Sequence, residues 1–330
     1  MMRYLFQLFI LVLTIIGCKK SDNGILVPPS DPGMPLVNQM NVQYGVAPDT
    51  SGNNVNLLLD IYFPPAATTA KKYPLFVMIH GGGYVGGDKN GNADECRVMA
   101  DSGFIAVTIN YRLGWRKGAG NCNGDTADLN KAMYRGLQDA HAALRFLVSK
   151  KNEYAIDENW IFIGGSSAGG NIALNTAYIN PMVAMQAFPG LNTLLGAINT
   201  SGNSLTTSFS IKGVCNMWGA LKDSSLVSSG NAIPQISFHG MMDNVVPYDF
   251  GRFQNCPNYI FMSGSLSLHR QLVRFNKSVI THLSVTGGHG PVEFSVPFMM
   301  SNTACFFKKI MKSTTVSPLV ITGVVNSCNM

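Results

Sequence analysis

The chain has 330 residues, of which 46% are apolar and only 13% are charged, so a disordered or strongly solvated chain is excluded. The formal net charge is +6, and no basic block exceeds two residues, which excludes the footprint of a nucleic-acid-binding protein. This length and composition fit a single enzyme domain built from a sheet and helices.

The N-terminal segment has the anatomy of an export signal. Arg3 precedes an apolar run over residues 4–16, which is too short to span a bilayer comfortably. Residues 15–18, Ile-Ile-Gly-Cys, resemble a bacterial lipobox, in which the cysteine is lipidated and becomes the new N-terminus. We therefore expect a signal peptide over 1–17 and a membrane anchor at Cys18. This predicts an exported lipoprotein of the bacterial cell envelope, on the outer membrane surface or in the periplasm.

The next stretch is rich in proline, with Pro-Pro at 28–29 and Asp-Pro-Gly at 31–33. It predicts a flexible tether over 18–40, followed by one catalytic domain over 41–330. Six cysteines besides Cys18 favour disulfides in an exported protein, although fifteen pairings are possible. No Cys-x-x-Cys pair or Cys/His cluster occurs, so a zinc site is not expected.

Short apolar strand candidates alternate with helical patterns along most of the chain. The strand candidates span residues 55–63, 75–79, 104–109, 160–163, 211–217, 236–238 and 282–285. Helical spacing occurs at 128–150, 168–179, 266–277 and 292–311. This alternation predicts a mostly parallel sheet covered by helices on both faces. The polar segments 181–210 and 219–233 are expected to form small insertions that shape the entrance of a pocket.

Residues 165–169, Gly-Ser-Ser-Ala-Gly, match the pattern G-x-S-x-G, and the spacing selects Ser167 rather than Ser166. An apolar strand leads into this motif and a helix leads out of it. This context indicates a tight turn that exposes the serine hydroxyl beside a helix N-terminus. The alternative is a glycine-rich strand–helix turn with an incidental serine.

Residues 80–83, His-Gly-Gly-Gly, follow another strand. Their glycines allow backbone N–H groups to point into a site, so Gly82, Gly83 and Ala168 are predicted to form an oxyanion hole. His80 is expected to hold the loop. The same region also spells a dinucleotide-binding G-x-G-x-x-G. That pattern requires a helix at once and an acid after the next strand, and neither is found here.

Asp243 follows the strand at 236–238 and is predicted to orient a histidine, with Asp249 and Asp223 as weaker candidates. A turn aspartate that caps a helix is the alternative for Asp243. Of six histidines, only His289 lies in a glycine-flanked loop after a late strand, where an imidazole can reach Ser167. The order Ser167, Asp243, His289 is that of α/β-hydrolases.

Together these motifs resemble the carboxylesterase/lipase family that carries an H-G-G-G oxyanion loop, from about residue 55 to 307. Residues 109–112, 138–147 and 239–240 resemble this family as well. The resemblance implies an α/β-hydrolase fold, Ser167 as nucleophile, His289 as base and Asp243 as its orienting acid. Ser166 stands where many members have an acidic residue, which bears on acyl preference and not on mechanism.

The sequence thus predicts hydrolysis of carboxylic esters by acyl transfer through Ser167. Acyl transfer through a serine requires neither a metal nor an organic cofactor. Tyr84, Trp115 and Trp218 follow strands at the expected active edge and are candidates to line the pocket. Acetyl or feruloyl esters on polysaccharides are one substrate hypothesis, and small generic esters are equally compatible. A peptidase and a non-catalytic binding protein on the same fold are the alternatives, and the oligomeric state is left open.

Overall fold

A computed structural model describes residues 19–20, 26–27, 33–120 and 122–328, so the expected signal peptide and Cys18 lie outside the described residues. Within the described part of the chain, no helix has the length and apolarity needed to cross a membrane. Two short strands, β1 (Lys19–Lys20) and β2 (Leu26–Val27), pair with each other in the predicted tether. Residues 34–36 already bond to the main domain, since the Leu36 N–H donates to the Ala67 carbonyl.

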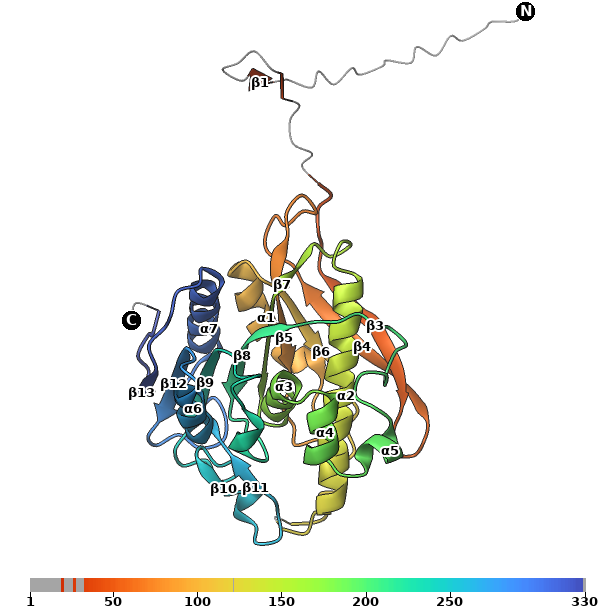
Figure 1. Ribbon diagram of the computed structural model, residues 1–330, viewed down its shortest axis with the longest axis vertical. Coiled ribbons are helices and arrows are strands. Elements are labelled where there is room, and N and C mark those ends of the chain that lie inside the picture. The colour runs from red at the N-terminus through yellow and green to blue at the C-terminus, as the bar shows by residue number, and fades with distance from the viewer. Residues whose placement is uncertain (1–18, 21–25, 28–32, 121, 329–330) are drawn as a thin grey trace, which may run out of the picture.

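The described residues form one large sheet whose order is β13-β12-β9-β8-β7-β5-β6-β4-β3 (Figure 1). Its strands are β3 (Gln39–Pro48), β4 (Asn54–Tyr62), β5 (Tyr73–Ile79), β6 (Ile105–Ile109), β7 (Ile156–Ser166), β8 (Ile211–Met217), β9 (Gln235–Gly240), β12 (Val279–Ser284) and β13 (Leu319–Thr322). From β6 to β13 all neighbours are parallel, whereas β4 runs antiparallel to both β6 and β3. This confirms the predicted mostly parallel sheet.

Helices cover both faces of the sheet. They are α1 (Ala93–Asp101), α2 (Thr126–Ser149), α3 (Ala168–Tyr178), α4 (Pro181–Ala187), α5 (Leu191–Leu195), α6 (Ser265–Arg274) and α7 (Val296–Met311), with short 3-10 turns η1 (Lys89–Asn92), η2 (Ser224–Leu226) and η3 (Phe253–Asn255). One buried core joins the sheet to α2, α3 and α6, and a second joins it to α1 and α7. The central strands are apolar almost throughout because both of their faces are buried.

A small hairpin of β10 (Phe250–Arg252) and β11 (Phe261–Ser263) lies outside the sheet, at the lower end of the molecule in Figure 1. The Cys122–Cys256 disulfide joins the segment before α2 to this region, and Cys305–Cys328 joins α7 to the C-terminal segment. The prediction of disulfides is therefore confirmed for four cysteines. Cys96 and Cys215 are buried free thiols, and burial raises the pKa of Cys215 to about 12.

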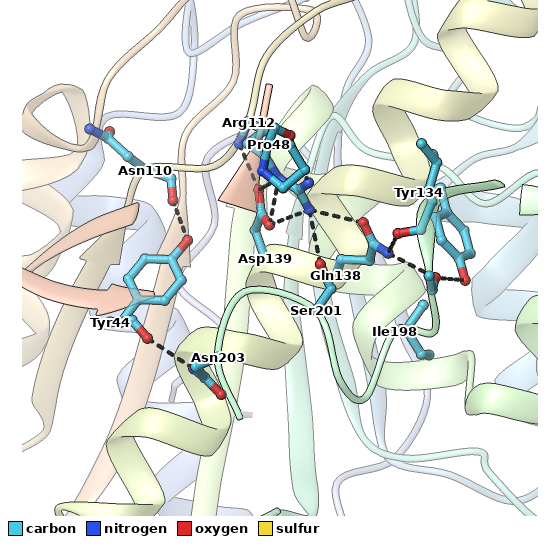
Figure 2. Close-up of polar contacts among 12 residues, drawn as sticks. Tyr44, Pro48, Asn110, Arg112, Tyr134, Gln138, Asp139, Ile198, Ser201 and Asn203 are labelled. Carbon is cyan, nitrogen blue, oxygen red and sulfur yellow. Dashed lines mark hydrogen bonds and ion pairs between the residues drawn. The ribbon is translucent and has the colours of Figure 1, made fainter. Parts of the chain in front are cut away.

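A buried polar network fixes segment 195–203 against α2 (Figure 2). Arg112 donates from Nη2 to Asp139 Oδ1 at 2.7 Å and to Gln138 Oε1 at 2.9 Å. Gln138 in turn donates to the carbonyl of Leu195 at 2.8 Å, and Arg145 donates to that of Ser201 at 2.6 Å. Residues 195–203 of the polar segment 181–210 therefore lie over α2.

Candidate active site

Ser167 occupies a sharp turn between β7 and α3. Its backbone has φ 55° and ψ −119°, a strained combination for a residue with a side chain, and its N–H donates to the Met217 carbonyl at 2.8 Å. A Cβ on Gly165 would collide with the Gly169 carbonyl, and a Cβ on Gly169 with the Ile79 carbonyl. Only glycine therefore fits two residues before and two after Ser167, which explains both glycines of the G-x-S-x-G pattern.

The structure brings Ser167, His289 and Asp243 together from three separate loops at the carboxyl edge of the sheet. His289 Nε2 lies 2.8 Å from Ser167 Oγ, and His289 Nδ1 lies 2.7 Å from Asp243 Oδ2. The other two acidic candidates lie elsewhere. Asp249 contacts Ser267 and Arg270, and Asp223 accepts from the Ser225 N–H in the turn before η2.

Asp243 has every acceptor position occupied. Its Oδ1 accepts from the N–H groups of Val245 at 2.8 Å and Val246 at 2.9 Å. Its Oδ2 also lies 3.1 Å from His239 Nε2, so two histidines share one oxygen. Burial on its own would raise the pKa of the Asp243 carboxyl, but hydrogen bonds from His239 and His289 hold it well below its usual range. Asp243 therefore stays ionised throughout the neutral range.

Sequence reasoning missed the role of His239, which belongs to a buried chain of hydrogen bonds beneath the site. His239 Nε2 faces two acceptors, Asp243 Oδ2 and the Val246 carbonyl, each at 3.1 Å, so this nitrogen carries the proton. His239 Nδ1 lies 2.8 Å from the Ser265 hydroxyl, which accepts from Asn216 at 3.0 Å. The signal available in the sequence was a histidine near the end of a buried strand, four residues before the acid.

The glycine loop faces the serine. Among the described residues, the N–H groups of Gly82, Gly83 and Ala168 donate no hydrogen bond within the protein, and all three residues line the pocket in front of Ser167. His80 is buried and stacks on Tyr111 with ring centroids 4.4 Å apart, while the Tyr111 hydroxyl donates to the His80 carbonyl at 3.1 Å. His80 thus anchors the loop and does not line the pocket.

The pocket has a volume of about 430 Å³. Tyr84, Trp115 and Trp218 line it as almost fully buried walls. The Tyr84 hydroxyl donates to Asn171 at 2.5 Å, and the Trp115 Nε1–H donates to the Asp125 carbonyl at 2.9 Å. Hydrogen bonds within the protein therefore fix the positions of the Tyr84 and Trp115 side chains.

The prediction that segments 181–210 and 219–233 shape the entrance was wrong. Of these two segments only Ala220 lines the pocket. The walls come instead from the segment around Trp115 and Lys117 and from the excursion around β10 and β11, with Phe253, Gln254 and Met262. The physical reason is the buried network around Arg112 and Arg145, which holds 195–203 against α2.

The described residues contain no group of three histidine, cysteine or acidic side chains placed to hold a metal ion. The glycine loop leads into the 3-10 turn η1, whose N-cap Asp88 bonds to the Asn90 N–H. The long helix that a dinucleotide site requires does not follow the loop directly.

Comparison with known proteins places the chain among esterases. A family model described as BD-FAE matches residues 59–228, slightly more than half of the chain. The chain is 33% identical to Carboxylesterase 3B of Mus musculus over 128 residues, 39% of this chain and 21% of that protein. It is 32% identical to Carboxylesterase 3 of Pongo abelii over 146 residues, 44% of this chain and 24% of that protein. The matches thus span about a fifth to a quarter of these curated relatives.

Solved structures share the fold over most of the chain. A truncated form of a carbohydrate esterase from gut microbiota matches with a TM-score of 0.58 at 21% identity, over 84% of this chain and 96% of that chain. Thermogutta terrifontis esterase 2, phosphorylated by paraoxon, matches with a TM-score of 0.53 at 18% identity, over 88% of this chain and 98% of that chain. The fold is therefore that of the α/β-hydrolases, and the chain belongs to the BD-FAE family.

Proposed function

We propose that the protein is a serine carboxylic-ester hydrolase with Ser167 as nucleophile, His289 as general base and Asp243 as the acid that orients His289. The observation that carries this proposal is the pair of short contacts, 2.8 Å from Ser167 Oγ to His289 Nε2 and 2.7 Å from His289 Nδ1 to Asp243 Oδ2. Nucleophile, base and orienting group in this order are what acyl transfer requires.

The reaction proceeds in two steps. His289 takes the Ser167 proton while Oγ attacks the ester carbonyl carbon, and the carbonyl oxygen becomes an oxyanion held by the N–H groups of Gly82, Gly83 and Ala168. The carbon–oxygen bond to the alcohol then breaks, and His289 gives its proton to the departing oxygen. Water repeats the sequence on the acyl-enzyme, which releases the carboxylic acid and restores Ser167. Asp243 stabilises the charged imidazole in both steps.

We propose acetyl or feruloyl esters on polysaccharides as the substrates. The similarity to a structure described as a carbohydrate esterase supports this choice, as do the tryptophans lining the pocket, since aromatic faces pack against sugar rings. The test compares release of acid from acetylated xylan and methyl ferulate with release from 4-nitrophenyl acetate and a peptide panel. Failure to release acid from any acylated sugar would contradict this substrate class, and turnover of peptides alone would favour a peptidase.

The catalytic assignment is tested by replacing one serine of a neighbouring pair. Ser167→Ala should lower kcat/KM for 4-nitrophenyl acetate by at least about 10⁴-fold, because it removes the nucleophile. Ser166→Ala is the matched control and should retain activity within about tenfold, since Ser166 lines the pocket but makes no bond in the proposed mechanism. Full activity in Ser167→Ala would refute the mechanism.

We also propose that the mature protein is exported and anchored through lipid on Cys18. The two disulfides support this proposal, because they persist in oxidising compartments. Mass spectrometry of the mature N-terminus after expression in a bacterial host tests it. A diacylglyceryl-modified Cys18 is the expected result, and an unmodified N-terminus at another residue would contradict it.

A further inference from the structure

A second cavity, of about 380 Å³, lies beside the pocket in front of Ser167 and shares Trp115 with it. Its size is in the range of small-molecule binding sites. One segment contributes to both spaces, because Lys117 lines the ester pocket whereas Arg116 lines the second cavity. We name the second space the arginine cavity. The side chains in its lining are those of Thr50, Trp115, Arg116, Asp128, Lys131 and Arg135.

The arginine cavity carries a positive charge. Its lining holds three cations, Arg116, Lys131 and Arg135, and one carboxylate, Asp128. Asp128 Oδ2 accepts a hydrogen bond from Arg116 Nε, and Asp128 Oδ1 accepts one from Lys131 Nζ at 3.3 Å. Arg116 also bonds to Asp125 at 3.2 Å. The acids at this place are therefore bonded to Arg116 and Lys131, and neither of them bonds to Arg135.

Arg135 is a buried cation without a partner. It is 8% exposed, and among the described residues it makes no hydrogen bond or ion pair. Its guanidinium nitrogens do not belong to the partnerless polar atoms that are shielded from solvent. Because Arg135 lines the arginine cavity, a ligand in that cavity can reach these nitrogens.

The lack of a partner follows from how the acids of α2 are used. Asp139, four residues after Arg135, pairs with Arg112 at 2.7 Å, and Asp128 is occupied as described above. Burial and repulsion from Arg112 lower the pKa of Arg135, despite attraction to these two acids. The guanidinium still keeps its charge at neutral pH, since the ordinary pKa of arginine is about 12.5 or higher.

A buried charge without a partner costs free energy, and a bound anion restores the missing hydrogen bonds. The planar guanidinium donates two parallel N–H bonds, a geometry that matches a carboxylate. Trp115 adds an aromatic wall and Thr50 adds a hydroxyl group, both of which suit a sugar ring. A sugar acid combines the carboxylate and the ring in one ligand.

We propose that the arginine cavity binds the carboxylate of a uronic acid unit of the substrate polysaccharide, with Arg135 as its main partner and Lys131 and Arg116 as further cations. This inference rests on the hydrolysis of polysaccharide esters proposed above. Trp115 walls both spaces, so one polymer can place an acyl group at Ser167 and a nearby sugar acid at Arg135. The cavity takes no part in bond making or breaking and acts on the choice of substrate.

Isothermal titration of the full chain tests the site without catalysis. The ligands are xylotriose that carries one glucuronic acid unit, xylotriose itself and inorganic phosphate. The acidic oligosaccharide should bind at least about tenfold more tightly than xylotriose, the gain expected from a charge-assisted hydrogen bond. Arg135→Gln should remove this difference. Equal binding of the two oligosaccharides to the unmodified protein, or binding of phosphate alone, would overturn the proposal.

Lys131→Gln is a second variant, at a partly exposed position, and it keeps the test decisive where Arg135→Gln does not fold. It should reduce the preference for the acidic oligosaccharide about threefold, less than Arg135→Gln, because Lys131 is already paired with Asp128. Arg97→Gln is the matched control, since Arg97 is an exposed arginine that pairs with Asp94 and lines neither space. It should leave the preference unchanged.

Kinetics on the acetylated forms of the two oligosaccharides test the same site during turnover. The unmodified protein should show about tenfold higher kcat/KM for the acidic ester, and Arg135→Gln should bring the two kcat/KM values together. The same preference in both proteins would overturn the role of Arg135. Hydrolysis of neither ester would instead refute the proposed function, while the titration would still decide whether the cavity binds a sugar acid.

Discussion

Two histidines meet one carboxylate oxygen beneath the pocket, since His239 and His289 both bond to Asp243 Oδ2. The pair keeps the Asp243 pKa low, and the two backbone N–H donors to Oδ1 fix the plane of the carboxylate. His289 is thereby held with Nδ1 toward Asp243 and Nε2 toward Ser167. At the scale of single residues, Asp243 is therefore an ionised carboxylate that holds His289 in place.

Replacing Asp243 tests this assignment. Asp243→Asn should lower kcat for 4-nitrophenyl acetate by about 10³–10⁴-fold, because the amide favours the wrong imidazole tautomer. Steady-state kinetics at pH 8 measure the effect.

The controls are the two aspartates that the sequence offered as weaker candidates. Asp249→Asn and Asp223→Asn should each keep kcat within about threefold, since neither contacts His289 in this structure. A large loss in either control, together with an active Asp243→Asn, would move the acid to another residue.

At the scale of elements, the Cys122–Cys256 disulfide joins the two segments that wall the pocket around Trp115 and Phe253. Trp115 packs against Phe253 and Tyr259, with ring centroids 5.7 and 5.8 Å apart, and the Gly124 N–H donates to the Tyr259 hydroxyl at 2.6 Å. The disulfide therefore acts on the shape of the pocket as well as on stability. Cys305 lies in the second half of α7, and neither Cys305 nor Cys328 lines the pocket.

Removing each disulfide separately should distinguish these roles. The chain-entropy model gives a loss of about 5 kcal/mol for the Cys122–Cys256 pair and about 3 kcal/mol for Cys305–Cys328, because their sequence separations are 134 and 23 residues. Urea unfolding of the two double Cys→Ser variants measures this. Only the first variant should also raise KM; an equal rise in both would contradict a role in shaping the pocket.

At the scale of the whole molecule, buried histidines make stability depend on pH. His282 stacks on Phe238 with centroids 4.9 Å apart, and burial lowers its pKa to about 4. In the unfolded chain a histidine titrates near 6.5, so the unfolded state binds the extra proton between these two values. The free energy of unfolding is therefore unaffected by this histidine above pH ~6.5, and it decreases as the pH falls toward 4, because the unfolded state then binds a proton that the folded state does not.

This loss amounts to about 3 kcal/mol of unfolding free energy, at 1.36 kcal/mol for each pKa unit. His282→Phe keeps an aromatic ring against Phe238 and removes the titrating group. Urea unfolding at pH 7.5 and pH 4 should show a smaller drop in the variant than in the unmodified protein. An unchanged drop would assign the pH dependence to other groups.

Much of the fold could be predicted from the sequence because central parallel strands are buried on both faces and give continuous apolar runs. Helix α1 and strand β13 were missed, since Ala93–Asp101 is short and Leu319–Thr322 is half-exposed. The hairpin of β10 and β11 has three-residue strands and depends on long-range contacts, which no local pattern reveals.

The site divides in the same way. Ser167 and the glycine loop follow from local motifs, because tight turns demand particular residues nearby in sequence. His239 could not be recognised, because its role arises from its contacts with both Asp243 and Ser265, and Ser265 lies in a distant segment of the chain. The path of residues 195–203 could not be predicted either. It depends on the bond from Arg112 to Gln138 of α2 and on the bond from Arg145 of α2 to the Ser201 carbonyl.

The central claim is that Ser167 is an activated nucleophile. It is tested most directly by treating the full chain with a fluorophosphonate probe and locating the adduct by peptide mass spectrometry. The account predicts one adduct, on Ser167, that is absent from Ser167→Ala, retained in Ser166→Ala and strongly slowed in Asp243→Asn. An adduct on a different residue, or no adduct on the folded protein, would contradict it.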